Sequence, residues 1–181
     1  MKKLLTGILI MVIVSTLVGC DQKSAPNDKS KEEIEFIEPE SSSWVNYTKP
    51  IREYMYYRTQ AVINDDINIL WKRYPELKNS IDRNLGINVE KYEVETLNKD
   101  FELIDANYNI EAYERIKVQT INENEIIVLV HGAVTYLRND FDESGGEHLI
   151  KIFLKRIENQ WTVVKTDEYT QEEYKEWLKD N

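Results

Sequence analysis

The feature that most constrains the fold is a long apolar run in the second half of the chain, from Glu125 to Arg138. Apolar residues occupy both alternating faces of this run. One face carries Ile126, Val128, Val130, Val134 and Tyr136, and the other carries Ile127, Leu129, Ala133 and Leu137. Strands that are buried on both faces have this pattern. We therefore expect a central strand with helices on one side and a partner subunit, a C-terminal helix or a ligand on the other.

The segments before this run repeat their apolar residues at helical spacing. A first helix is expected to begin near Pro50, because proline suits the first helical turn. Its buried stripe comprises Ile51, Tyr54, Met55, Arg58, Ala61 and Val62. A second helix is expected to end before Pro75. The segment 90–104 is ambiguous, although Tyr92, Val94 and Thr96 alternate as in a strand.

The later segments alternate at strand period and are separated by short polar turns. The expected strands are 112–121, 125–138, 148–157 and 160–167, with a polar loop at 139–147. Thr170 and Glu173 form a capping-box pattern that opens a short final helix. Helices followed by hairpin-linked strands indicate an α+β fold, with N-terminal helices packed on an antiparallel sheet and a short C-terminal helix.

The N-terminal segment has the layout of a cleaved secretory signal. Lys2 and Lys3 precede an apolar stretch, 4–18, that is short for a membrane-spanning helix. The following Leu17-Val18-Gly19-Cys20 resembles the lipobox of bacterial lipoproteins. The resemblance implies cleavage between Gly19 and Cys20 and acylation, including palmitate, on Cys20. The alternative is an uncleaved anchor, which would give the same topology.

Three segments follow from this reading. Residues 1–19 are the expected signal peptide, 20–43 the lipidated cysteine and a flexible linker rich in Ser and Pro, and 44–181 one folded domain. The expected location is the extracytoplasmic face of the cell membrane in the cell envelope. The membrane is then a partner through the lipid on Cys20, because two acyl chains anchor stably where one does not.

Composition argues against several classes of function. The net charge of −10 makes nucleic acid an unexpected partner. Cys20 is the only cysteine, so acylation leaves no thiol for a metal or a nucleophile. Asp140 and Asp142 resemble the start of a calcium loop, but Lys151 stands where the bidentate glutamate belongs. We therefore expect no metal and no cofactor.

Two runs in the first half and one near the end resemble nuclear transport factor 2-like domains, also called cystatin-like cones. They are Ala61-Val62-Ile63-Asn64-Asp65-Asp66, Leu70-Trp71-Lys72-Arg73-Tyr74-Pro75-Glu76-Leu77 and Trp161-Thr162-Val163-Val164-Lys165-Thr166. The resemblance covers Trp44 to about Tyr169 and implies a strongly curved antiparallel sheet. The superfamily includes isomerases, dehydratases and polyketide cyclases as well as non-catalytic binding and dimerising modules. This chain departs from the pattern by adding a C-terminal helix.

Enzymes of that superfamily hold a polar dyad at the bottom of the cone, which makes His131 the candidate base here. Thr135 shares its face, and Tyr108 and Trp71 complete the candidate pocket. The competing interpretation is a hydrogen-bonded histidine in the sheet, with Gly132 marking a bend. We expect a non-catalytic module that binds an extracytoplasmic protein or a small apolar ligand. The alternatives are an isomerase- or cyclase-type enzyme using His131, and a structural homodimer joined through the open sheet face.

Overall fold

The computed structural model describes residues 35–99, 102–110 and 116–180. The expected signal peptide, Gly19 and Cys20 lie outside these residues. The chain divides into two units, of which Ile34–Asn181 is the compact unit discussed below. Within the described ranges, no helix is both long enough and apolar enough to cross a bilayer.

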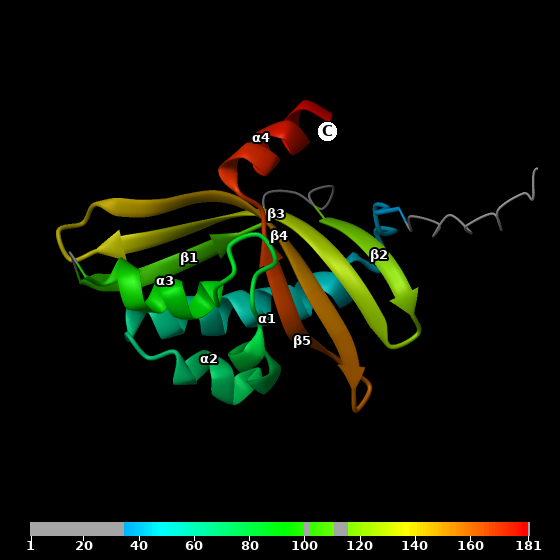
Figure 1. Ribbon diagram of the computed structural model, residues 1–181, viewed down its shortest axis with the longest axis horizontal. Coiled ribbons are helices and arrows are strands. Elements are labelled where there is room, and N and C mark those ends of the chain that lie inside the picture. The colour runs from blue at the N-terminus through cyan, green and yellow to red at the C-terminus, as the bar shows by residue number, and fades with distance from the viewer. Residues whose placement is uncertain (1–34, 100–101, 111–115, 181) are drawn as a thin grey trace, which may run out of the picture. The chain divides into compact units, whose positions relative to one another are not determined.

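Helices and strands follow one another in the order expected for an α+β fold (Figure 1). The helical elements are α1 (Trp44–Ile63), α2 (Asn68–Arg73), the 3-10 helix η1 (Pro75–Asn79) and α3 (Val89–Leu97). The strands are β1 (Leu103–Asn109), β2 (Ile116–Asn122), β3 (Glu125–Arg138), β4 (Glu143–Ile157) and β5 (Gln160–Glu168), and α4 (Gln171–Asp180) ends the chain. The predicted fold class is confirmed.

The sheet is antiparallel and is built around β3. Strands β1, β3, β4 and β5 lie in this order, and β2 also pairs with β3. The first half of β3 pairs with β2 and its second half with β1, so these two strands follow each other along one edge. Strand β5 pairs with β4 only from Ile150 onward. Among the described residues, the preceding part of β4, Glu143–Leu149, therefore has no strand on its second edge.

The apolar core lies between the inner face of the curved sheet and the helices. Helix α1 runs along this face, while α4 lies on the opposite side of the sheet (Figure 1). The fully buried core residues run from Ile51 to Val163. They include Ile51, Met55 and Val62 of α1, Val128 and Val130 of β3, and Ile150, Ile152 and Leu154 of β4. The core residues among those described therefore all lie within the expected domain, 44–181.

Two helix predictions need correction. Helix α1 begins at Trp44, so Pro50 lies inside it rather than at its start. Residues Val89–Leu97, expected to favour a strand, form α3, whose N-cap Asn88 accepts a hydrogen bond from Lys91 N at 2.9 Å. Glu90 and Val94 are its buried residues. A spacing of four places them on one helical face, so burial in the tertiary structure outweighed the short alternating pattern.

The expected polar loop at 139–147 is much shorter in the structure, because β4 begins at Glu143. Phe141 takes a left-handed backbone conformation with φ of 66° in the tight turn. The carboxylate of Asp140 contacts Arg138 Nη2 at 2.5 Å and accepts from Asp142 N at 3.1 Å. The two aspartates that resembled a calcium loop thus lie at a hairpin turn, where Asp140 pairs with Arg138.

The predicted capping box of the last helix is confirmed. Glu173 N donates to Thr170 Oγ1 at 3.3 Å, and Thr170 N donates to Glu173 Oε2 at 2.8 Å. Each side chain thus satisfies a backbone donor at the start of α4.

The end of the segment expected to be a linker contacts the sheet. Ile37 and Val118 form an antiparallel bridge, with Ile37 N donating to Val118 O at 3.0 Å and Val118 N donating to Ile37 O at 2.7 Å. The bridge lies on β2, and Lys151 lies 5.7 Å above the ring of Phe36. The compact unit therefore begins before α1.

Candidate functional site

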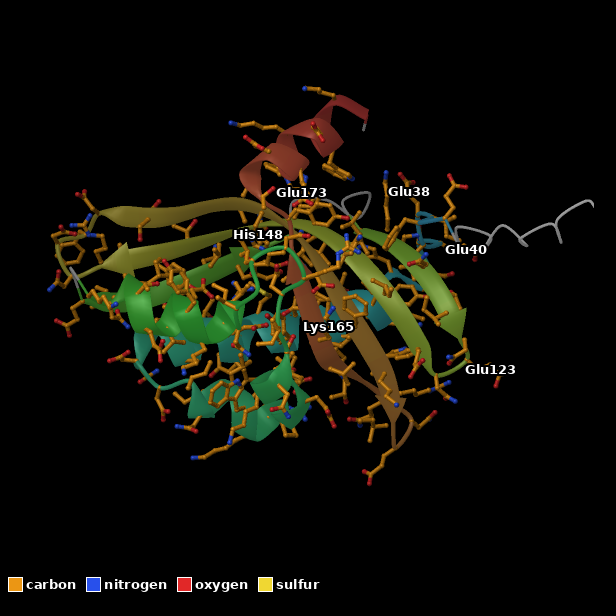
Figure 2. All side chains as sticks on the ribbon, in the orientation of Figure 1. Glu38, Glu40, Glu123, His148, Lys165 and Glu173 are labelled. Carbon is orange, nitrogen blue, oxygen red and sulfur yellow. The ribbon has the colours of Figure 1, made fainter. Side chains whose placement is uncertain are left out.

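An open cavity of about 940 Å³ lies where α3 and the loop before it face the inner side of the sheet. Its apolar wall comprises Met55 of α1, Leu85 of the loop, Val89 and Leu97 of α3, and Val134 of β3. Polar groups at the cavity come from α1, α3, β4 and β5, and α4 contributes Tyr174 and Lys175 at the rim. Figure 2 marks His148 on β4 and Glu173 in the first turn of α4, close to this junction.

The cavity follows from the sheet topology. Residues Ser144 to His148 line it, and they belong to the part of β4 that extends beyond β5. Two of them, Gly145 and Gly146, carry no side chain that would fill the space. A Cβ atom at Gly145 would lie 2.1 Å from the carbonyl oxygen of Val134, so a side chain there is excluded by the backbone of β3. An unpaired strand edge and α3 thus enclose a space that neither fills.

A buried arginine closes the inner end of the cavity. Arg58 Nε donates to Glu93 Oε2 at 2.6 Å, and Arg58 Nη2 lies 2.6 Å from Glu168 Oε1. Arg58 Nη1 donates to Tyr54 Oη at 3.4 Å. Burial lowers the pKa of Arg58, but the carboxylates of Glu168 and Glu93 outweigh it, so the pKa lies well above its ordinary value. The guanidinium is therefore a permanent cation with each nitrogen engaged.

Glu93 joins this cation to the sheet. Its second oxygen, Oε1, accepts a hydrogen bond from Tyr136 Oη at 3.0 Å. Burial raises the pKa of Glu93, and the nearby Arg58 opposes this shift. Burial also raises the pKa of the Tyr136 hydroxyl, with the charge of Glu93 acting in the same direction. The tyrosine therefore stays protonated and donates to the carboxylate.

A second carboxylate on α3 extends the network. Glu90 is 1% exposed, and its Oε1 accepts from Tyr54 Oη at 2.9 Å and from Thr166 Oγ1 at 2.5 Å. Burial, followed by the charge of Glu90, raises the pKa of Tyr54 well above its ordinary value. The network thus connects α1, α3, β3 and β5 through charge-assisted hydrogen bonds, which are stronger than neutral ones.

His148 lies on the wall beside Tyr108, whose ring it stacks on with centroids 5.7 Å apart. Burial, with the charge of Arg58, lowers the pKa of His148 to about 4, so the imidazole is neutral at pH 7. Tyr108 Oη and His148 Nε2 are buried and, among the described atoms, have no hydrogen-bond partner. Gly132 makes room for the tyrosine, because a Cβ there would lie 2.9 Å from Tyr108 Oη.

Gly132 was expected to mark a bend in the strand, but the structure gives it a different role. The pairing of β3 with β4 continues without a register shift through Gly132 and its partner His148. Gly132 is therefore required by the close approach of Tyr108, not by an irregularity in the strand.

The predicted base, His131, lies outside the cavity wall. Alternation along β3 places His131 on the face opposite to Val130 and Val134, under α4. The side chain is buried there, with Nε2 2.6 Å from Tyr174 Oη and 3.5 Å from Glu147 Oε2.

The other three candidates are not gathered around His131. Thr135 shares its face but lies four residues further along β3, where it pairs with Gly145. Tyr108 pairs with Val134 in the register and lies on the inner face. Trp71 packs against the core from α2, with Lys78 5.8 Å from its ring. None of the four is among the described residues that line the cavity.

The groups that do form the site were missed from sequence, and one signal for them was present. Arg58 occupied a place in an otherwise apolar helical stripe, where a charged residue needs a buried partner. Its partner Glu93 lies in the segment that was ambiguous and alternated as in a strand. The i, i+3 spacing of Glu90 and Glu93 was therefore not recognised as one face of a helix. Glu168 and His148 gave no local signal, because only strand pairing brings them to α1 and Tyr108. In the described ranges, no group of three or more His, Cys, Asp or Glu is placed to hold a metal ion.

No protein-family model and no curated protein matches the sequence. Among solved structures, the chain is similar to a nuclear transport factor 2-like superfamily protein from Salmonella enterica, with 12% identity, a TM-score of 0.46, and 71% of this chain and 92% of that chain covered. The association domain of C. elegans CaMKII has 11% identity, a TM-score of 0.45 and coverage of 71% and 99%.

A protein with a cystatin-like fold from Nostoc punctiforme has 12% identity, a TM-score of 0.44 and coverage of 67% and 88%. The helices and the antiparallel sheet of the structure form the α+β fold that the sequence resemblance implied. Similarity this distant concerns the fold alone and does not separate an enzyme from a binding module.

We expect Arg58→Met to lower the free energy of unfolding by about 3–5 kcal/mol, because it leaves the buried carboxylates of Glu93 and Glu168 without their cation. Urea unfolding at pH 7 measures the loss. Lys49→Met is the control, since Lys49 is an exposed cation on the same helix and its loss should change stability by about 0.5 kcal/mol or less. Equal losses in the two variants would contradict a stabilising role for the network.

His148 should make the protein less stable in acid. Its pKa is about 4 in the folded state against 6.5 for the free side chain, so only the unfolded chain gains a proton as the pH falls below 6.5. Stability from this group is complete above pH 6.5 and is lost towards pH 4, by up to about 3 kcal/mol.

We expect His148→Gln to reduce this pH dependence. The measurement is urea unfolding of the variant and the wild type at pH 7 and pH 4. The same loss of stability in both proteins between these pH values would show that His148 is not the titrating group.

Proposed function

We propose that this chain is a bacterial lipoprotein, anchored through Cys20 on the extracytoplasmic face of the membrane, whose compact unit binds a small, mainly apolar ligand. The cavity between α3 and the sheet would be the binding site. Binding rather than catalysis is the role we assign to it.

The observation that carries the binding function is the size and lining of the cavity. Protein interiors are close-packed, and voids larger than a few water molecules are rare. A space of about 940 Å³ lies within the range of small-molecule sites, which is about 300–1,000 Å³. Its wall is mainly apolar, with polar groups at the inner end and at the rim, and ligand pockets usually combine apolar surface with a small number of polar groups. A ligand in the cavity would supply the van der Waals contacts that the opposing walls do not make with each other.

The state of the ionisable groups favours binding over catalysis. Arg58 has each nitrogen engaged, and both oxygens of Glu93 take part in contacts to Arg58 and Tyr136. General acid–base catalysis needs a group with a pKa near the working pH. His148 is neutral with a pKa of about 4, and His131 lies on the other face of the sheet. The polar groups of the wall therefore hold the structure and orient a ligand.

The lipobox pattern in the sequence supports the anchor. Residues 21–33 separate Cys20 from the compact unit, so the anchor and the cavity belong to different parts of the chain. The net charge of −10 would keep the folded unit away from an anionic lipid surface. The lipid on Cys20 would then supply the attachment and the cavity the recognition.

We expect Cys20→Ser to abolish lipidation and release the protein from the membrane, because the variant has no thiol to acylate. Metabolic labelling with an alkyne palmitate analogue and partitioning into a detergent phase measure the two effects. Ser15→Ala, within the same apolar segment, should leave both unchanged. A Cys20→Ser protein that remains in the membrane fraction would indicate a spanning anchor instead.

Native mass spectrometry tests the binding function. The chain from Asp21 to Asn181, which contains the whole described core, should retain extra mass when purified gently from the envelope of secreting cells, and should lose it on denaturation. Thr96→Trp should abolish the extra mass, because residue 96 lines the cavity and the larger side chain fills it. Glu95→Trp, at the exposed neighbouring position on α3, should retain it. A bare mass for the wild type would contradict the proposal.

A further inference from the structure

We infer that the ligand of this cavity is an apolar amine, with a compact hydrocarbon body and a cationic head that contacts the carboxylate of Glu168. This inference rests on the proposed function and adds the charge class of the ligand. It depends on which polar atoms of the buried side chains already have partners and which do not.

The inner part of the cavity carries a net negative charge. Glu93 and Glu168 are buried or half-buried, with side chains 14% and 21% exposed, and Arg58 is the cation between them. The second cation, Lys175, lies exposed at the rim on α4. Neutral His148 adds no positive charge to the wall. One guanidinium therefore faces two carboxylates in the inner part of the cavity.

Arg58 is poorly placed to receive an anion, because two carboxylates already flank it. Nε, Nη1 and Nη2 are already directed to Glu93, Tyr54 and Glu168. These contacts use three of the five N–H groups of the guanidinium. An incoming carboxylate or phosphate that reached the other two would lie beside the carboxylates of Glu93 and Glu168 and would be repelled by them. The cavity therefore disfavours an anionic head.

Glu168 is the acceptor available to a ligand. Its Oε1 pairs with Arg58, and no described residue makes a hydrogen bond or an ion pair to its Oε2. A carboxylate oxygen accepts hydrogen bonds and cannot donate them when ionised, so its complement is a donor or a cation. An ammonium group satisfies both requirements and would balance the charge of this end of the cavity.

The remaining wall suits the rest of such a molecule. Met55, Leu97 and Val134 provide apolar surface for a hydrocarbon body. Tyr92 and Tyr174 line the same space, and the faces of aromatic rings attract cations. An apolar amine therefore uses both the carboxylate and the aromatic part of the lining.

Three probes with the same body and different heads test the inference. They are cyclohexylmethylamine, cyclohexylmethanol and cyclohexanecarboxylate, titrated calorimetrically into the chain from Asp21 to Asn181 at pH 7. We expect the amine to bind at least tenfold more tightly than the alcohol, and the carboxylate at least tenfold more weakly. Equal affinities, or a preference for the carboxylate, would overturn the inference and leave the cavity as a binding site. Failure of all three probes, together with a bare native mass, would remove the proposed function as well.

A substitution of Glu168 then tests whether its carboxylate contacts the cationic head. Glu168→Gln keeps the shape and an acceptor oxygen but removes the charge, so the preference for the amine over the alcohol should fall at least fivefold. Glu95→Gln, an exposed carboxylate on α3 outside the cavity, should keep the preference. A thermal unfolding scan of both variants shows that they fold. A folded Glu168→Gln protein with an unchanged preference would overturn the assignment of the head to Glu168.

Discussion

The arrangement of this protein depends on one buried cation. Arg58 on α1 is held by the carboxylates of Glu93 on α3 and Glu168 on β5. Glu93 also accepts a hydrogen bond from Tyr136 of β3, and Arg58 donates one to Tyr54 of α1. A charge taken out of water is costly unless it is paired and hydrogen-bonded. The fold satisfies that requirement only when α1, α3 and β5 take their observed positions together. The network is therefore a specificity constraint on the tertiary structure as well as a source of stability.

The cavity results from the same arrangement. Glu93 fixes α3 to Arg58 and Tyr136, which places the helix beside the part of β4 that extends beyond β5. Gly145 and Gly146 leave two positions of that part of β4 without side chains. The helix is near enough to enclose a space but is held too far away to fill it. A polar network that stabilises the fold thus also forms the inner end of the ligand site.

Helix α4 covers the outer face of β3 and also lines the rim of the cavity. Tyr174 of α4 contacts His131 Nε2 at 2.6 Å and Glu147 Oε2 at 2.5 Å, while Trp177 packs against the same imidazole. These contacts cover the outer face of β3, which the apolar pattern of that strand required. Because Tyr174 and Lys175 also line the cavity, α4 connects the cover of the outer face to the rim of the site.

Some of this structure was determined by the sequence alone. The order of helices and strands, the two-faced burial of β3 and the capping box at Thr170 and Glu173 follow from local periodicity and local hydrogen bonding, which depend on near neighbours along the chain. The lipobox pattern at Cys20 is local as well, and it remains a prediction for residues outside those described.

The site was decided only by the tertiary structure. Alternation showed that His131 and Thr135 share a face of β3, but not which face the helices cover. The pairing of β4 with β5 brings Glu168 to Arg58, and the contact of α1 with α3 brings Glu93 there. The contacts of Arg58 with Glu93 and Glu168 join residues more than 30 positions apart, and the free energy of burying a charge depends on partners that local pattern does not reveal. The physical reason is that a strand or helix propensity is a property of a segment, whereas a satisfied buried ion is a property of the assembled fold.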